Sequence, residues 1–262
     1  MNKPDSDAYR AKKKFFDQVL TLYGRKPVLE ALQDKDVQVH RLHLASSNRP
    51  APIIEEITEL ATAKGADLRY HDRQSLSRIS KNAKQDQGVA LDVICRDYGD
   101  YQGFLESPPQ RNFELLALDG ITNPQNLGMI LRSACAGSID AVLLPKQGSA
   151  QIDPLVIKAS AGTLFKTRIL RCDKLDQALK AFQSQGSQIY GLSSHAPQSL
   201  GDTLPSGPKI FVLGNETDGV SPAVSKTCDQ LLSIPMNNGV ESLNVAVTAS
   251  LLAFRGLLGG QA

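Results

Sequence analysis

The sequence predicts an α/β protein with two units, each built from alternating strands and helices. In the carboxyl-terminal half, short apolar runs of strand length alternate with amphipathic runs of helix length. This alternation is typical of a mostly parallel sheet with helices on both faces. A segment rich in Gly and Pro at residues 98–112 separates this half from a shorter α/β pattern before it, as a linker would. A length of 262 residues is sufficient for two modest domains.

The amino-terminal unit is expected to be a small α/β domain over residues 23–97. Its first helix is predicted from an opening proline, and its second from an amphipathic run that ends at Gly65. Its main strand alternates apolar and polar residues, as half-buried strands do. In chain order we expect a helix at 27–33, a strand at 39–45, a helix at 53–64, a strand at 68–71, a helix at 74–80 and a strand at 89–95.

Residues 1–22 are expected to form a basic arm that is flexible or partly helical. The cations near this end are Lys3, Arg10, Lys12, Lys13, Lys14, Arg25 and Lys26, against Asp5, Asp7 and Asp17. Such a cluster suits contact with phosphate groups. These charges alone are equally consistent with a solvated, disordered tail. The net charge of the whole chain is only +2, so composition by itself does not indicate a nucleic-acid partner.

The carboxyl-terminal unit is expected to cover residues 113–262. The predicted strands lie at 115–118, 141–144, 168–170, 189–192, 210–213 and 231–234. The predicted helices lie at 128–136, 155–161, 175–185, 222–227 and 245–258. Because strands and helices alternate along the chain, we expect a mostly parallel sheet with helices on both faces.

Composition excludes several classes of protein. The four cysteines and four histidines show no metal-ligand spacing, so we interpret the cysteines as reduced thiols and expect no metal site. No apolar run is long enough to span a membrane, and the polar amino terminus lacks a signal-peptide core. We therefore expect a cytoplasmic protein with no membrane partner.

Polar stretches follow three predicted strands of the carboxyl-terminal unit, at residues 119–137, 214–219 and 235–244. Ligands of parallel α/β sheets bind at the carboxyl ends of strands, so these stretches are candidate site loops. None matches a Walker A loop or a G-x-G-x-x-G fingerprint, which argues against ATP and NAD. Histidines are scarce in this half, so a Ser–His–Asp arrangement is not indicated either.

The three stretches contain motifs in a fixed order, each with its flanking strand. They are Asn126-x-Gly128-x3-Arg132, then Leu213-Gly214-Asn215-Glu216-x2-Gly219, then Ile234-Pro235-Met236-x2-Gly239-x2-Ser242-Leu243-Asn244-Val245-x-Val247. Over residues 113–258 this ordered set resembles the SpoU/TrmH (SPOUT) family, which are RNA ribose 2′-O-methyltransferases that use S-adenosylmethionine. The amino-terminal unit, which begins YGRKPVLEAL, is similar to the small RNA-binding α/β domain of many members.

The resemblance implies more than the pattern of strands and helices can. It implies a deep trefoil knot in the carboxyl-terminal domain, although knots are rare exceptions to topological rules. It also implies a homodimer through that domain, with S-adenosylmethionine bound in the knot. The chain resembles most the branch that methylates a guanosine ribose in 23S ribosomal RNA.

The family pattern assigns a set of cofactor-binding positions. They are Leu213, Gly214, Ile234, Met236, Leu243 and Asn244. Backbone atoms recognise the adenosine part in this pattern, which explains how apolar residues such as Ile234 and Leu243 can bind it. The alternative is structural, with Gly214 as a turn glycine and the apolar residues in the core.

The family pattern also assigns the catalytic positions, which are Arg132, Asn126, Glu216, Ser242 and Asn244. A guanidinium stays protonated, so we interpret Arg132 as a phosphate clamp rather than a base. Glu216 is expected to orient Arg132 or to accept from the ribose, unless it is merely solvated. Ser242 and Asn244 are expected to contact the cofactor or orient Arg132. Both are also good helix N-cap types.

Two alternatives to a 23S rRNA methyltransferase stay open. One keeps the chemistry but changes the substrate to tRNA, or to a ribosomal site where methylation confers antibiotic resistance. The other is a non-catalytic RNA-binding or ribosome-assembly factor with the same fold. The whole catalytic set is present, which argues against a factor without activity: Asn126, Arg132, Glu216, Ser242 and Asn244.

Overall fold

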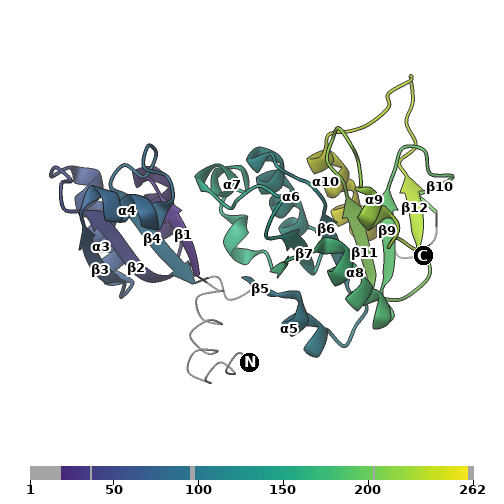
Figure 1. Ribbon diagram of the computed structural model, residues 1–262, viewed down its shortest axis with the longest axis horizontal. Coiled ribbons are helices and arrows are strands. Elements are labelled where there is room, and N and C mark those ends of the chain that lie inside the picture. Colours follow the sequence, from purple (N-terminus) through teal and green to yellow (C-terminus); the bar gives the residue numbers. More distant parts are fainter. Residues whose placement is uncertain (1–18, 36, 95–97, 203, 259–262) are drawn as a thin grey trace, which may run out of the picture. The chain divides into compact units, whose positions relative to one another are not determined.

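The computed structural model describes residues 19–35, 37–94, 98–202 and 204–258, which belong to two compact units, residues 1–98 and 99–262 (Figure 1). Most of the expected basic arm lies outside the described residues. Its last positions are folded, because strand β1 (Val19–Tyr23) begins four residues before the expected domain start. Local sequence pattern did not predict β1, because the stability of this strand comes from pairing with a strand some seventy residues later, Val19 with Ile94 and Tyr23 with Ala90.

The amino-terminal unit contains a four-stranded sheet in the order β1-β4-β2-β3. The other strands are β2 (Gln38–Ala45), β3 (Asp67–His71) and β4 (Val89–Ile94), and the helices are α2 (Arg25–Gln33), α3 (Pro52–Ala63) and α4 (Arg73–Ser80). Strand β4 is antiparallel to β1 and β2, and β3 is parallel to β2. On one face Leu76 of α4 packs with Tyr23, Ala45 and Ala90. Side chains of alternate residues face the opposite side.

The carboxyl-terminal unit contains an eight-stranded sheet in the order β10-β12-β9-β11-β6-β7-β8-β5. Its strands are β5 (Tyr98–Asp100), β6 (Glu114–Leu118), β7 (Ala141–Pro145), β8 (Ile169–Cys172), β9 (Gln188–Leu192), β10 (Gln198–Ser199), β11 (Lys209–Leu213) and β12 (Gln230–Ser233). Each pair from β10 to β8 is parallel. This confirms the mostly parallel sheet predicted from the alternation of strands and helices.

Helices cover both faces of this sheet. They are α5 (Tyr101–Glu106), α6 (Pro124–Ala136), α7 (Pro154–Ala159), α8 (Leu175–Ser184), α9 (Pro222–Ser225) and α10 (Val245–Leu258), with a 3-10 turn at Thr163–Lys166. Helix α8 packs Leu179 and Phe182 on the face that carries Leu143 and Val212. The other face meets α10, whose Arg255 guanidinium lies 5.8 Å from the ring centre of Phe211. Helix α6 packs against α7 and α10 (Figure 1).

Residues 98–112 were expected to form a linker, but part of this segment is a strand and a helix. That segment contains β5 and α5, and Asp100 caps the helix by accepting a 3.0 Å hydrogen bond from the backbone N–H of Gln102. Phe104 is 1% exposed and contacts Phe113 edge to face, with ring centres 5.1 Å apart. Its ring also lies 4.7 Å from the Arg168 guanidinium. The glycines and prolines obscured an apolar spacing of Tyr101, Phe104 and Leu105, which suits a short helix.

The described cysteines, Cys135, Cys172 and Cys228, are free thiols, and Cys95 lies outside the described residues. Burial raises the pKa of Cys172 to about 12 and the pKa of Cys228 to about 11. Both are therefore protonated at neutral pH and are poor nucleophiles. Among the described residues, no His, Cys, Asp and Glu side chains cluster in a way that could hold a metal. Nor does the described part contain a helix with the length and apolarity to cross a membrane.

We predict that Phe104→Ala destabilises the carboxyl-terminal unit by about 3–5 kcal/mol, because it leaves a cavity among packed aromatic rings. Urea unfolding followed by circular dichroism measures this change. Leu155→Ala is the control, since Leu155 is 49% exposed and its truncation is expected to change stability little. A loss below about 1 kcal/mol for Phe104→Ala would contradict the packing of α5 described above.

Candidate active site

The candidate site lies where the strand order of the large sheet reverses. From β6 the chain moves through β7 and β8 to one side, and later returns with β11 on the other side of β6. Such a reversal leaves a crevice at the carboxyl ends of the two central strands. The loops after β6 and β11 leave from these two ends, and the loop after β12 leaves two strands further along.

The loop after β11 is held by its own backbone and one side chain. Asn215 Oδ1 accepts hydrogen bonds from the N–H groups of Thr217 at 2.9 Å and Asp218 at 2.7 Å. The loop folds back so closely that a Cβ at position 214 would collide with the backbone of Gly219. Gly214 is therefore required by the shape of the loop itself. The sequence allowed either a cofactor contact or a turn at Gly214. The structure shows that it forms the turn, and the cofactor contact stays a prediction.

The loop after β6 leads directly into α6. Asn123 caps this helix, because its Oδ1 accepts from the N–H of Gln125 at 2.9 Å and of Asn126 at 3.4 Å. The same loop is fastened to the β11 loop, since Asp119 Oδ2 accepts from the N–H of Ser221 at 2.7 Å. The cap fixes the first turn of α6 and so the position of Asn126, which is 6% exposed.

Asn126 joins all three loops through its side-chain amide. Its Nδ2 donates to Glu216 Oε1 of the β11 loop, and its Oδ1 accepts from Asn244 Nδ2 at 3.2 Å. The three residues are far apart in the sequence, and each belongs to a different motif. A carboxylate oxygen accepts hydrogen bonds, so the NH2 group of Asn126 must point toward Glu216. The amide oxygen of Asn126 then points toward Asn244. Glu216 thus contacts Asn126 in this structure and not Arg132.

Asn244 also caps the last helix. Its Oδ1 accepts from the N–H of Ala246 at 2.9 Å, and its backbone carbonyl accepts from Thr248 at 3.0 Å. Helix α10 is fixed against α6 by a 2.8 Å hydrogen bond between the hydroxyls of Ser133 and Ser250. Where α6 ends, a Cβ on Gly137 would collide with the backbone of Ala253. This close packing holds the start of α10, and with it Asn244, beside α6.

A cavity of about 460 Å³ lies against these loops. Of the positions predicted for the cofactor, Leu213, Gly214, Ile234, Met236 and Leu243 line it, as do Ser242 and Glu216 from the catalytic set. Asn126 and Asn244 do not line it, but both belong to the hydrogen-bonded chain that ends on Glu216. The structure therefore brings nine of the ten predicted positions, all except Arg132, to one place.

Arg132 lies on the exposed side of α6 and does not line the cavity. Within the part of the chain that the structure describes, its guanidinium makes no hydrogen bond or ion pair. The free side chain stands three positions from Met129, an exposed apolar residue of the same helix. Arg132 is thus available to a partner molecule rather than engaged in the fold.

Part of the cavity wall was not predicted from the sequence. Ser193, Ser194 and His195 line it from the loop after β9, and Thr248 lines it from α10. Strand β9 lies between β11 and β12, so its carboxyl end opens at the same edge. The signal was the position of residues 193–195 after a predicted strand, but the stretch carries no motif that sets it apart. The acidic residues Glu216, Asp218 and Glu241 also line the cavity, which makes its wall rich in hydrogen-bond acceptors.

Two family models match the chain in succession. The RNA 2′-O ribose methyltransferase substrate-binding family matches residues 21–98, and the SpoU rRNA methylase family matches residues 114–254. The boundary between the matches agrees with the division of the structure into two units near residue 98. The fold of each unit therefore corresponds to one family.

Curated relatives and solved structures agree with these matches. A 23S rRNA (guanosine-2′-O-)-methyltransferase, RlmB, of Xanthomonas axonopodis pv. citri (strain 306) is 34% identical over 224 residues, which is 84% of this chain and 89% of the relative. An uncharacterized tRNA/rRNA methyltransferase of Mycobacterium sp. (strain KMS) is 32% identical over 238 residues, covering 90% and 75% of the two chains.

Among solved structures, the SpoU methyltransferase AviRb from Streptomyces viridochromogenes in complex with AdoMet has a similar fold. Its TM-score is 0.67 at 22% identity, with 98% of this chain and 96% of AviRb covered. An AdoMet-bound rRNA methyltransferase from Sinorhizobium meliloti has a TM-score of 0.64 at 21% identity, with 97% and 92% covered. With two matched family models, three site motifs on adjoining loops and relatives more than 30% identical, the chain belongs to the SpoU rRNA methylase family.

Proposed function

We propose that this SpoU-family enzyme methylates the ribose 2′-OH of a guanosine in 23S rRNA, with S-adenosylmethionine as the methyl donor. The observation that carries the proposal is the hydrogen-bonded chain Glu216–Asn126–Asn244 beside the cavity. It joins one residue from each motif and so fixes the three loops relative to one another. A preorganised site of this kind suits a reaction in which positioning supplies much of the rate.

The cavity fits a nucleoside-type cofactor by size and chemistry. Its volume of about 460 Å³ lies in the range of ordinary small-molecule sites. Apolar side chains from Leu213, Ile234 and Leu243 line it beside exposed carboxylates. Carboxylates accept hydrogen bonds from ribose hydroxyls, and apolar side chains pack against a purine. When bound there, S-adenosylmethionine supplies a methyl group already activated by the positive sulfur.

The deep trefoil knot expected from the resemblance is part of this proposal. The segments concerned are the loops after β11 and β12, whose residues 213–220 and 234–243 supply most of the cavity wall. A chain threaded through itself at this edge would hold the loops tightly around a bound nucleoside. Such a fold would restrict motion of the bound cofactor, and the strands of the sheet would not need to move.

Arg132 is proposed to bind RNA phosphate and so to place the ribose 2′-OH in line with the methyl group. Its exposure and its lack of partners in the described part of the chain support this role. A guanidinium offers two parallel N–H donors that match phosphate oxygens. It keeps its own proton, so it stabilises a developing alkoxide by charge rather than by accepting the proton.

The substrate is proposed from the relatives and from the amino-terminal unit. RlmB, 34% identical, is named as acting on a guanosine ribose of 23S rRNA. Residues 21–98 match a substrate-binding family, which supports recognition of a large structured RNA. Ribosomal RNA as substrate also supports the cytoplasmic location expected from the sequence. The mycobacterial relative is named for tRNA or rRNA, so tRNA is the second candidate.

A homodimer through α6 and α10 is part of the proposal. Val247 and Leu251 stand one helical turn apart on α10 and are 47% and 43% exposed. Met129 on the neighbouring α6 is 41% exposed. Apolar side chains gathered on adjacent helices are typical of a protein interface. Because Arg132 shares this side of α6 with Met129, a dimer would place Arg132 at the edge of the interface.

Mapping 2′-O-methyl groups tests the substrate. RNA from cells with and without the gene is hydrolysed in alkali, where a 2′-O-methyl group blocks cleavage at one position. A block at a guanosine of 23S rRNA that disappears with the gene supports the proposal. A block that disappears only from tRNA supports the second candidate. No change in either RNA would indicate a binding factor without activity.

We predict that Arg132→Ala lowers methyl transfer about 100-fold or more and changes S-adenosylmethionine affinity less than about twofold, because a positioning charge is lost outside the cavity. Filter assays with labelled methyl donor and calorimetry measure the two quantities. Lys180→Ala removes an exposed cation from α8 and serves as the control. Near-normal turnover of Arg132→Ala would refute the proposed phosphate-binding role of Arg132.

We predict that Gly214→Ala weakens S-adenosylmethionine binding at least about tenfold, because the added methyl group forces the β11 loop away from Gly219 at a cost of about 1–3 kcal/mol. Calorimetric titration measures the affinity. Gly201→Ala is the matched control, since its Cβ would meet only the Ser199 hydroxyl at 3.4 Å. Unchanged affinity of a folded Gly214→Ala variant would argue against this loop as the cofactor site.

We predict that Leu251→Glu weakens self-association about 100-fold or more, because it would bury an unpaired charge in an apolar interface. Sedimentation velocity over a range of concentrations measures the dissociation constant. Gln177→Glu adds the same charge to the exposed side of α8 and is expected to leave association unchanged. A variant that remains dimeric would mean that α10 is not in the interface.

A further inference from the structure

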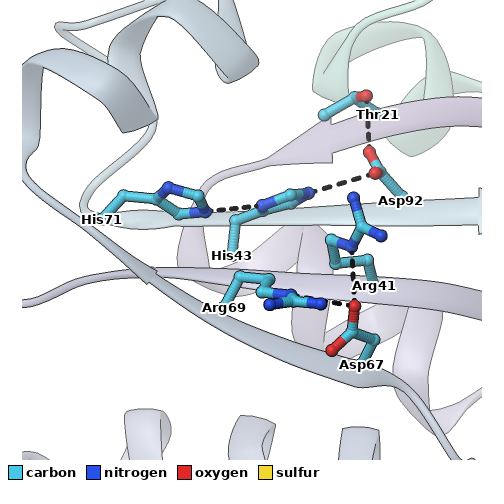
Figure 2. Close-up of polar contacts among 7 residues, drawn as sticks. All are labelled: Thr21, Arg41, His43, Asp67, Arg69, His71 and Asp92. Atoms are coloured by element: carbon cyan, nitrogen blue, oxygen red, sulfur yellow. Dashed lines mark hydrogen bonds and ion pairs between the residues drawn. The ribbon is translucent and has the colours of Figure 1, made fainter.

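A line of hydrogen-bonded side chains crosses the sheet of the amino-terminal unit. Thr21 Oγ1 donates to Asp92 Oδ1 at 2.7 Å, and Asp92 Oδ2 lies 3.0 Å from His43 Nε2. His43 Nδ1 in turn lies 2.9 Å from His71 Nε2. Figure 2 shows these residues in a row. One comes from each of β1, β4, β2 and β3, in the order in which the strands pair, and the row ends on the edge strand β3.

The middle of this row is buried. His43 is 4% exposed and Asp92 is 8% exposed, at sheet positions where apolar residues would normally lie. Burial raises the pKa of Asp92, but the hydrogen bonds from His43 and Thr21 outweigh burial and hold the pKa below its ordinary value. Asp92 is therefore ionised at neutral pH. A buried carboxylate contributes little to stability compared with apolar packing. Stability alone therefore does not explain the row, and we infer that it has a function.

An ionised Asp92 determines how the two histidines can share protons. His43 Nε2 must carry a hydrogen, because the carboxylate only accepts. With both rings neutral, His71 Nε2 donates to His43 Nδ1, and the outer nitrogen of His71, Nδ1, is an acceptor. When one solvent proton binds at His71 Nδ1, the Nε2 proton passes across the 2.9 Å bond to His43 Nδ1. The charge then rests on His43 beside Asp92, and the outer nitrogen of His71 has become a donor.

The outer nitrogen is open to a ligand. His71 is partly exposed, and within the described residues its Nδ1 has no hydrogen-bond partner. Burial, followed by the nearby His43, lowers the pKa of His71. The groups around the pair are Arg41 and His40 on β2, Arg69 on β3 and Asp72 at the start of α4. In the free protein at neutral pH, His71 is therefore neutral, with its outer nitrogen as an acceptor.

Two arginines stand beside His71 on the same face of the sheet. Arg41 Nε and Arg69 Nε each donate to Asp67 Oδ2 at 3.0 Å (Figure 2). Hydrogen bonds from Arg69 and then Arg41 hold the pKa of Asp67 below its usual range. One carboxylate thus neutralises one of two guanidinium charges, and the Nη donors of both arginines have no partner among the described residues. Arg69 and His71 are two residues apart on β3, about 7 Å along the strand.

The same edge also presents an aromatic ring. Tyr70, between Arg69 and His71, is 63% exposed, and no other described aromatic side chain is among the exposed large hydrophobics. Because side chains alternate along a strand, the ring lies on the opposite face of β3 from Arg69 and His71. A single-stranded segment that runs along the edge strand can contact the guanidinium groups on one face with its phosphates and stack a base on the ring on the other. Charged side chains on an edge strand also prevent pairing with other strands, but that role requires neither the buried row nor the ring.

We propose that the β3 edge surface, defined as Arg41, Arg69, Tyr70 and His71, contacts an unpaired segment of the RNA substrate, and that His71 donates to an RNA phosphate oxygen after the His71–His43 pair takes up one proton. The inference rests on the proposed function, since it names where the substrate RNA meets the amino-terminal unit. Arg41 and Arg69 supply the remaining phosphate donors, and Tyr70 supplies a surface for a base.

Proton uptake by the histidine pair determines the direction in which RNA affinity changes with pH. A phosphate at the outer nitrogen favours the donor form of His71, so binding of RNA raises the proton affinity of the histidine pair. By linkage, RNA affinity must then rise as the pH falls from about 8 to about 6, the range in which histidines titrate. Binding of RNA therefore takes up protons, and the uptake is greatest between the pKa of the free histidine pair and the higher pKa of the pair in the complex.

The test measures binding of the full-length chain to in vitro transcribed 23S rRNA by filter retention, at several pH values and salt concentrations. His71→Gln keeps a polar side chain but cannot titrate, so affinity is expected to fall about tenfold at pH 6 and to lose its pH dependence. Asp92→Asn removes the charge that supports protonated His43 and should flatten the same profile. Arg69→Ala should reduce the salt dependence by about one phosphate contact.

Lys35→Ala is the matched control, because Lys35 is an exposed cation of the same unit between α2 and β2. It is expected to change neither affinity nor pH dependence by more than about twofold. Thermal unfolding and S-adenosylmethionine affinity report whether each variant is folded. Calorimetry in buffers of different ionisation enthalpy measures the proton uptake directly and does not depend on any variant.

The outcomes separate this inference from the proposed function. Wild-type protein that neither binds nor methylates 23S rRNA or tRNA overturns both. Wild-type protein that methylates RNA, with His71→Gln and Arg69→Ala equal to it in affinity, overturns the β3 edge surface alone. Variants that bind free RNA normally but fail to modify ribosomal particles would place a ribosomal protein on this surface, which also overturns it.

Discussion

The carboxyl-terminal unit depends on the two hydrogen bonds made by the side chain of Asn126. One amide, held at the start of α6, donates to Glu216 and accepts from Asn244. These bonds connect loops that follow β6, β11 and β12, so none of the three can move without breaking a contact to a buried polar group. Leaving such a group unpaired costs about 1–3 kcal/mol, which favours one arrangement of the loops. The cavity wall is a consequence of that arrangement.

Helix packing makes these bonds possible. Gly137 lets the end of α6 approach α10, and the Ser133–Ser250 bond fixes the two helices along their length. The parallel sheet contributes the rest, because it opens the carboxyl ends of β6, β11, β9 and β12 at one edge. We propose that methyl transfer uses this edge for the cofactor and the exposed side of α6 for RNA. The amino-terminal unit uses its polar groups differently, as one line across a sheet that ends at His71.

The sequence predicted most of the fold because the strands of the parallel sheet are short, apolar and regularly spaced. It missed β1, β5, β10 and α5. Strand β1 depends on a distant partner, Ile94, whereas the apolar spacing of α5, which places Phe104 near Phe182, was obscured by glycines and prolines. Nine of the ten predicted site positions lie together, since motif residues at strand ends must meet at one edge. The contact of Glu216 with Asn126, the wall after β9 and the histidine row could not be predicted, because each depends on which strands are neighbours.

The identity of the methylated nucleoside tests the central claim most directly. Purified enzyme is incubated with unmodified 23S rRNA and S-adenosylmethionine labelled in the methyl group, and the RNA is digested to nucleosides that are separated by chromatography. If the proposed function is correct, the label appears in 2′-O-methylguanosine and in no base-methylated nucleoside. Label on a base, or no transfer to any RNA despite binding of S-adenosylmethionine, would contradict it.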